Sequence, residues 1–186
     1  MNRCFWVNKK NPLYVKYHDE EWGVPSFDDD YLFEMLVLES FQAGLSWECI
    51  LNKREAFREA FNHFNKEKIA SYNEEKVEEL LQNTGIVRNR RKILATIQNA
   101  KIFMSIQQEF GSFSNYIWSF SKGKIMKRKT KKNIASNSLS DKISKDLMKR
   151  GMHFVGTTII YSYLQAIGII NDHDLDCDWY KKGENI

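Results

Sequence analysis

Both prolines of this chain, Pro12 and Pro25, fall within its first 25 residues. Proline removes a backbone donor and clashes with the preceding helical turn, so nothing after Pro25 interrupts a long helix on that ground. No run of residues alternates apolar and polar side chains as a half-buried strand does. With 186 residues, 42% of them hydrophobic, the chain is long and apolar enough to bury a core. The sequence therefore predicts an all-α fold with little or no sheet.

Capping and turn residues divide the chain into successive helices after an irregular, aromatic-rich segment expected over 1–27. Gly44 closes the first predicted helix, which aspartates open, and Ser46 is the predicted N-cap of the next. A tight turn at Thr84–Gly85 precedes a long helix. Helices joined by short turns form a bundle-like fold. The predicted helical stretches are 28–44, 46–61, 73–110 with that turn inside it, 113–120, 140–150 and 157–168.

The first residues lack the apolar stretch of a secretory signal. The longest apolar run, residues 154–170, contains two threonines, a serine and a glutamine, so a buried helix explains it better than a membrane span. Three cysteines without an export signal indicate a reducing compartment. We therefore expect a cytoplasmic protein that does not contact membranes.

The net charge of +4 hides a strongly basic segment between Lys122 and Lys132, which has seven basic residues and no acidic one. Outside it, 21 basic residues stand against 24 acidic ones. Such a run is either a solvated loop or a patch that faces phosphates.

The acidic tail NDHDLDCDW, residues 171–179, places a histidine and a cysteine four residues apart. On one helical turn, His173 and Cys177 reach the same ion, although the spacing alone is common by chance. Cys4 and His18 near the other end complete a closed tetrahedral set of the structural zinc type. A closed set leaves no open coordination position, which argues against a zinc hydrolase.

Asp172, Asp174 and Asp176 resemble the start of an EF-hand calcium loop. However, Cys177 occupies the place of the obligatory glycine and Gly183 that of the bidentate glutamate, which excludes the EF-hand interpretation. The aspartates are then outer-shell acceptors or a negative field around a dication.

Glu39 stands in the middle of an apolar helical stripe. Its face of the predicted helix carries Leu32, Met35 or Leu36, and Ala43. A carboxylate there is costly unless something meets it. Either Glu39 lies at the helix edge, half solvated or paired with a lysine, or it is a pocket acid that accepts hydrogen bonds from a ligand.

Six aromatic residues lie in the sequence near Cys4, His18 or Glu39. They are either ordinary core residues or walls that sandwich a flat ligand, and a cationic ring gains further from their faces. They are Phe5, Trp6, Tyr14, Tyr17, Trp22 and Trp47.

The turn at Gly85 is followed by Arg88, Arg90, Arg91 and Lys92. This pattern is either an ordinary helix–helix turn or one whose backbone amides approach a phosphate. Basic residues suit a helix N-terminus poorly, which favours an external anion.

Five segments together resemble the bacterial DNA-3-methyladenine glycosylase I family, nearly end to end and less so across 121–140. They read RCFWV, NPLYVKYHDEEWGVP, LFEMLVLESFQAGLSW, GIVRNRRKI and FVGTTIIYSYLQAIGIINDH. The resemblance implies a helix–hairpin–helix DNA glycosylase that excises 3-methyladenine from alkylated double-stranded DNA. It implies a single domain over 1–186, a monomer, with a terminal lobe formed by 1–27 and 171–186. Cys4, His18, His173 and Cys177 are then the ligands of a structural Zn²⁺.

By the same resemblance, Glu39 is the catalytic carboxylate and binds the excised base together with Tyr17, while Trp47 stacks on it. Trp6, Tyr14 and Trp22 complete the pocket.

The resemblance also assigns a DNA-binding surface. Gly44 and Leu45 place a side chain in the gap left by the flipped nucleotide. The hairpin TGIV lacks the second glycine usual in the wider superfamily, because Val87 stands there. Phosphate contacts are expected from Gly85, Arg88, Arg90 and Arg91.

A base methylated at a ring nitrogen is cationic and already a good leaving group. The enzyme therefore does not need to supply a strong acid to cleave the glycosidic bond. Glu39 is expected to recognise and stabilise the base rather than to act as a nucleophile. No lysine stands out as a Schiff-base former, so a monofunctional enzyme releasing free 3-methyladenine is expected. The rival hypothesis is a non-catalytic, zinc-stabilised binder of damaged DNA, which does not need the Glu39, Tyr17 and Trp47 constellation.

Overall fold

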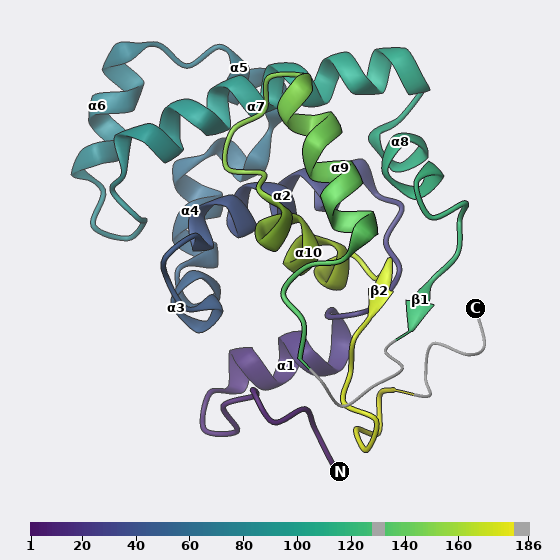
Figure 1. Ribbon diagram of the computed structural model, residues 1–186. Helices are drawn as coiled ribbons and strands as arrows, with labels where there is room; N and C mark the ends of the chain where they lie inside the picture. Colours follow the sequence, from purple (N-terminus) through teal and green to yellow (C-terminus); the bar gives the residue numbers. More distant parts are fainter. Residues whose placement is uncertain (128–132, 181–186) are drawn as a thin grey trace.

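The computed structural model describes residues 1–127 and 133–180, and it is mostly helical, as predicted (Figure 1). Five of the expected helical stretches end within a few residues of the observed bounds. The helices are α1 (Pro12–Glu20), α2 (Asp29–Gln42), α3 (Trp47–Asn52), α4 (Arg54–Ala60), the short 3₁₀ helix η1 (Asn62–Phe64), α5 (Lys66–Ala70), α6 (Glu74–Gln82), α7 (Arg90–Phe110), α8 (Phe113–Ser119), α9 (Ser138–Lys149) and α10 (Thr157–Ala166).

The N-terminal segment is not irregular throughout, since α1 forms within it. The Asn11 side chain accepts hydrogen bonds from the backbone N–H groups of Leu13 and Tyr14. Pro12 occupies the first helical position, where a missing N–H costs nothing. The Asn-Pro pair is therefore a helix start, which the expectation for residues 1–27 overlooked.

The helix predicted over 46–61 is broken into two. The Ser46 hydroxyl caps α3 by accepting from the Cys49 N–H, as expected. At Lys53 the chain leaves α3 and enters α4. The Lys53 Nζ then reaches the carbonyls of Thr84 and Gly85, at 3.3 and 3.4 Å. The break thus places a donor against the turn between α6 and α7.

Two very short strands were not predicted. β1 (Met126–Lys127) pairs in parallel with β2 (Ile170–Asn171), with Met126 opposite Ile170. Part of the basic segment expected to be a loop is therefore strand, while residues 128–132 lie outside the described part. Two residues are too few to show the alternation by which a strand is recognised in a sequence.

α2 is the central element, with α10 beside it and α7 crossing on the other side in Figure 1. An unbroken run of α2, from Met35 through Phe41, is buried. The Tyr163 hydroxyl on α10 donates to the Leu32 carbonyl at 3.0 Å, which fixes the two helices against each other. This packing holds any polar residue in the middle of α2 inside the molecule.

The two ends of the described chain lie side by side. The backbone of Asn2 donates to the Asp178 carboxylate at 2.9 Å and accepts from the Asp178 N–H at 3.0 Å. The Trp179 indole donates to the Asp19 carbonyl at 2.8 Å. These bonds bring residues from both ends of the sequence to one site. Among the described helices, none is long and apolar enough to cross a membrane.

Candidate functional site

A cavity of about 220 Å³ lies between α1, α2, α3 and α10. All six aromatic residues singled out in the sequence line it, as does Glu39. The other wall residues were not predicted to line a cavity, because they meet only in the folded chain. The full lining is Phe5, Trp6, Tyr14, Tyr17, Trp22, Glu39, Gln42, Trp47, Asn133, Ile134, Ser162, Gln165 and Asp172.

Glu39 is buried, with 3% of its surface exposed. It is therefore not the half-solvated helix-edge residue of the first alternative considered above. Its Oε2 atom receives no hydrogen bond from the part of the chain that the structure describes. Burial away from water raises the pKa of this carboxyl to about 8. A buried acceptor that faces a cavity without a partner is suited to a ligand that brings a donor.

The aromatic rings around Glu39 form two groups. Tyr17 and Trp47 lie with ring centroids 5.2 Å apart and planes at 45°. Trp6 packs against Trp22 at 4.8 Å and against Tyr14 at 5.2 Å. The Trp47 Nε1 is also buried without a partner among the described residues. The cavity therefore offers flat apolar faces together with a buried donor and a buried acceptor that have no partner among the described residues.

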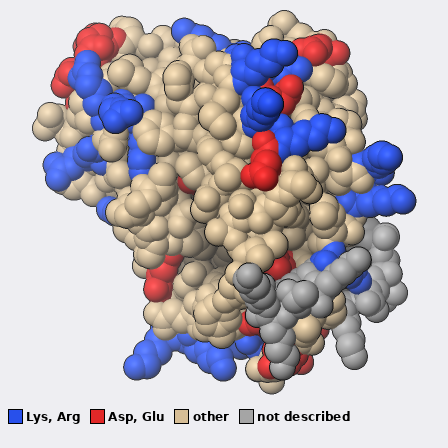
Figure 2. Space-filling view, in the orientation of Figure 1, with Lys and Arg blue, Asp and Glu red and all other residues tan. Residues whose placement is uncertain are grey.

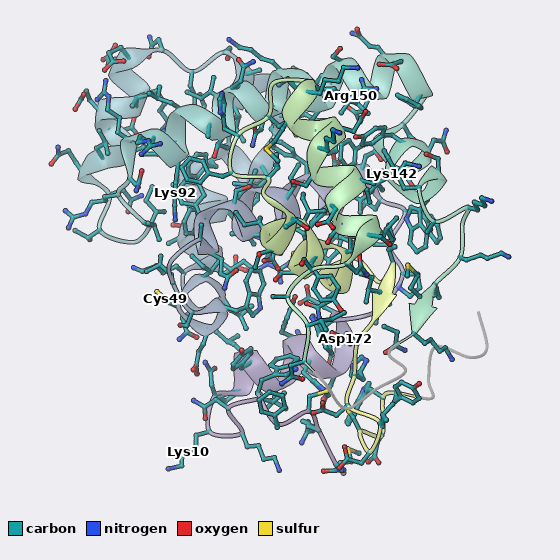
Figure 3. All side chains as sticks on the ribbon, viewed as in Figure 1. Lys10, Cys49, Lys92, Lys142, Arg150 and Asp172 are labelled. Carbon is teal, nitrogen blue, oxygen red and sulfur yellow. The ribbon has the colours of Figure 1, made fainter. Side chains whose placement is uncertain are left out.

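The wall opposite α2 carries a second carboxylate. Asp172 follows β2, in the region between α10 and α1 in Figure 3. Its Oδ2 accepts hydrogen bonds from the Gln165 amide at 2.7 Å and the Tyr161 hydroxyl at 3.1 Å. Asp172 had been considered only as part of the acidic tail, yet α10 holds it at the cavity wall.

Gly44 and Leu45 form a tight turn directly after α2. Gly44 has a φ of +81°, which suits a residue without a Cβ. The Leu45 N–H donates to the Gln42 carbonyl at 2.7 Å, and the Gln42 side chain donates to the Leu45 carbonyl at 3.1 Å. The Leu45 side chain is 39% exposed. Gln42 also lines the cavity, so the Leu45 backbone is bonded directly to a residue of the cavity wall.

The predicted hairpin lies between α6 and α7. A Cβ on Gly85 would come within 2.9 Å of the Ala56 Cβ, so the turn packs too closely against α4 for a larger residue. Arg88 and Arg91 are exposed. Arg90 forms ion pairs with Glu74 and Glu78 of α6.

Figure 2 shows Lys and Arg side chains over α6 and this hairpin, and a separate group over α9, with acidic side chains among them. Lys92 differs from the arginines before it, because its side chain is buried.

The structure brings Cys4, His18, His173 and Cys177 together, and all four are buried. Their ligand atoms lie within 4.8 Å of one another, and the Cys177 Sγ is 3.5 Å from the His18 Nε2. Burial raises the pKa of the Cys4 thiol well above its usual range. Cys49 on α3 is half-buried and outside this cluster.

Each histidine of the cluster is oriented by a second polar residue. The His18 Nδ1 lies 2.8 Å from an Asp19 carboxylate oxygen, and the His173 Nδ1 lies 2.9 Å from the Asn171 amide oxygen. An Nδ1–H that donates to these oxygens leaves the Nε2 lone pair for a metal ion. Two thiols and two such imidazoles supply the four ligands of a tetrahedral zinc ion. Because the site is enclosed and all four positions are filled by the protein, no coordination position is left open.

One detail of the metal prediction was wrong. Residues 173–177 form a tight turn, closed by the Cys177 N–H on the Asp174 carbonyl at 2.8 Å, and not a helical turn. The oxygens that orient the histidine rings belong to Asp19 and Asn171, neither of which the sequence analysis had identified. The Asp174 carboxylate instead accepts from the Phe5 N–H at 3.0 Å and so joins the two ends. A polar residue within two positions of each histidine, Asp19 and Asn171, was the sequence signal that could have identified these orienting oxygens.

Comparison with known proteins places this geometry in context. The chain matches the model of the methyladenine glycosylase family over residues 6–181. It is 48% identical over 183 residues to the DNA-3-methyladenine glycosylase 1 of Escherichia coli, with 97% of each chain covered.

The fold is also similar to that of solved 3-methyladenine DNA glycosylase I structures. A crystal structure of a 3-methyladenine DNA glycosylase I has a TM-score of 0.91 and 48% identity, covering 95% of this chain and 98% of that one. A structure describing 3-methyladenine recognition by the enzyme of Staphylococcus aureus has a TM-score of 0.90 and 38% identity, covering 96% of each chain.

Proposed function

The chain belongs to the methyladenine glycosylase family, whose members hydrolyse N-glycosyl bonds, and we propose that it excises 3-methyladenine from alkylated double-stranded DNA as a monofunctional enzyme. The chain is a DNA-3-methyladenine glycosylase, as its relatives are. The base-binding, catalytic and DNA-binding roles of its own residues are our proposals.

One observation supports the proposal most directly: the unpartnered, buried carboxylate of Glu39 faces an aromatic cavity. At about 220 Å³ the cavity is smaller than the roughly 300–1,000 Å³ of pockets for drug-sized ligands, so it suits a single flat base. Tyr17 and Trp47 supply faces for stacking, and Trp6, Tyr14 and Trp22 enclose the rest. A base carrying N–H donors gains hydrogen bonds from Glu39, and a cationic base gains a charge interaction as well.

The ionisation of Glu39 is coupled to the charge of its ligand. In the empty cavity, burial holds its pKa at about 8 and favours the neutral acid. A cationic base beside the carboxyl favours the ionised form, because opposite charges at close range lower the pKa of an acid. Glu39 therefore stabilises the cationic base up to bond cleavage, after which water attacks the sugar carbon.

The base must leave the DNA stack before it reaches the cavity, at a cost of a few kcal/mol. We assign Leu45 to the gap that the flipped nucleotide leaves, because its side chain is exposed and its backbone is bonded to Gln42 of the cavity wall. The turn at Gly85, with Arg88 and Arg91, contacts the phosphates. Arg90 contributes to that contact only as far as Glu74 and Glu78 release it.

We further propose a single domain, present as a monomer, in which the terminal lobe is held by a structural zinc ion. Residues 1–27 and 171–180 form the described part of that lobe, and 181–186 lie outside it. Cys4, His18, His173 and Cys177 would hold the ion, which would supply cross-linking of the two ends.

The proposal is tested by incubating the protein with a methylated DNA duplex and separating the released bases by chromatography. Free 3-methyladenine should appear, with the strand left uncut. Borohydride added during turnover should trap no covalent adduct with DNA. A non-catalytic binder of damaged DNA would retain the duplex and release no base, and a trapped adduct would refute the monofunctional mechanism.

A further inference from the structure

Lys92 is a buried lysine for which base recognition gives no role. It lies in the first turn of α7, where Figure 3 labels it, and only 6% of its surface is exposed. Its Nζ donates to the carbonyls of Phe41 and Ala43, both at 2.7 Å. Within the described chain no carboxylate forms an ion pair with it. Burial lowers its pKa.

The position of Lys92 is explained by α2 and not by its own helix. A cation in the first turn of α7 faces the positive end of that helix dipole, which is unfavourable. The two carbonyls it meets are at the C-terminal end of α2, where unsatisfied carbonyls carry partial negative charge. Lys92 thus acts as a cap supplied to α2 by the helix that follows the hairpin.

A third segment closes the same junction. The Phe154 ring lies 5.9 Å from the Lys92 Nζ. The Phe154 carbonyl accepts from the Ser40 hydroxyl of α2 at 3.1 Å, and Phe154 has a φ of +53°. A strained residue persists only where its surroundings determine its conformation. The end of α2 is therefore held rigidly by α7 and by the segment before α10.

The carbonyls that Lys92 holds lie next to the residues proposed to handle the flipped nucleotide. Ala43 directly precedes the Gly44–Leu45 turn, and Glu39 lies one helical turn before it. On its other side, Lys92 stands a few residues after the hairpin at Gly85. Lys92 thus ties the start of the helix that follows the proposed phosphate contact to the carbonyl that precedes the proposed DNA-filling turn.

We propose that Lys92 is a positioning residue for base excision, which sets the Leu45 turn relative to the hairpin. The hairpin holds the DNA by its phosphates. Lys92 then fixes the distance between the hairpin and Leu45, so that Leu45 enters the duplex where the base is extruded toward the cavity. This inference rests on the proposed function. Lys92 acts through Leu45 and does not touch the base, since it is absent from the cavity wall.

The test compares Lys92→Met, which keeps the chain length and removes the donors, with Lys101→Met on an exposed part of the same helix. Single-turnover release of 3-methyladenine from DNA should fall roughly 10- to 100-fold in Lys92→Met, as expected for a displaced positioning element. Affinity for free 3-methyladenine should stay within about twofold of wild type, because the cavity walls are unchanged. Lys101→Met should match wild type in both measurements.

A double-mutant cycle with Leu45→Ala decides whether Lys92 acts through the turn. If it does, Lys92→Met should slow Leu45→Ala far less than it slows the wild type. Multiplicative losses would overturn the inference, as would a parallel loss of free-base affinity. If Lys92→Met does not fold, Lys92→Gln, which removes the charge and shortens the side chain, is held to the same criteria. A wild-type protein that releases no base would instead refute the proposed function itself.

Discussion

The Sγ of Cys177 lies 3.5 Å from the Nε2 of His18, although 159 residues separate the two in the sequence. Their approach is accompanied by Cys4 and His173 and by oxygens on both Nδ1 atoms. This is the arrangement expected of a metal-bound pair of chain ends.

The first prediction concerns this cluster. Cys177→Ser should lose the zinc, about one ion per chain, and lower the free energy of unfolding by on the order of 3 kcal/mol, because the metal joins the two ends. Cys49→Ser, outside the cluster, should keep both metal and stability. Elemental analysis and denaturant unfolding measure the two quantities. Full zinc occupancy in Cys177→Ser would remove Cys177 from the ligand set.

The second prediction follows from the raised pKa of Glu39. The folded protein holds this proton up to about pH 8, whereas the unfolded chain releases it near the ordinary value of 4.5. Between these two pH values the unfolded state binds fewer protons, so the stability of the wild type falls as pH rises. Glu39→Gln does not titrate and escapes this loss.

The stability advantage of Glu39→Gln over wild type should therefore grow by on the order of 3 kcal/mol between pH 5 and pH 8. Urea unfolding at both pH values measures it. The exposed Glu59→Gln serves as the control and should show no such growth. An advantage that is equal at the two pH values would show that Glu39 keeps an ordinary pKa in the folded protein.

The third prediction concerns the basic segment. Neutralising Lys127, Arg128, Lys129 and Lys131 should weaken DNA binding and flatten its dependence on salt, because fewer counterions are released. Lys127 lies in β1, and the other three are outside the described residues. Affinities measured across a series of salt concentrations give the slope. An unchanged slope would mean that the segment does not contact phosphates.

Much of the fold could be predicted because its signals are local. Asp28, Asn73 and Asn89 cap α2, α6 and α7 through their own side chains, and such capping residues mark helix starts in a sequence. The break at Lys53 could not be foreseen. The start of α4 has no side-chain cap hydrogen bond, so no capping residue marks it in the sequence.

The site divides in the same way. Glu39 stood out because a carboxylate is unusual in an apolar helical stripe, whereas the roles of Tyr17 and Trp47 came only from the family resemblance. Asp172 did not, since Gln165 and Tyr161 bring it to the cavity only through the packing of α10. Lys92 was grouped with exposed arginines because its acceptors on α2 lie about fifty residues earlier in the chain.

The proposed mechanism depends most on the Glu39 carboxylate, and one substitution tests the role of that carboxylate directly. Glu39→Gln keeps the size of the side chain, removes its charge and replaces one acceptor oxygen with a donor. The variant should fold and retain zinc, because the metal cluster is built from other residues. Its affinity for free 3-methyladenine should fall, and neither protein should release undamaged adenine, which lacks the charge and keeps a strong glycosidic bond.

The decisive quantity is the single-turnover rate of 3-methyladenine release from methylated duplex DNA, compared between wild type, Glu39→Gln and Glu59→Gln. We expect Glu39→Gln to be slower by roughly 10- to 1000-fold, the effect of one misplaced polar partner in a dry site. Glu59→Gln should match the wild type. A wild-type rate in well-folded Glu39→Gln would contradict the proposed role of the carboxylate and leave stacking and DNA distortion to carry the reaction.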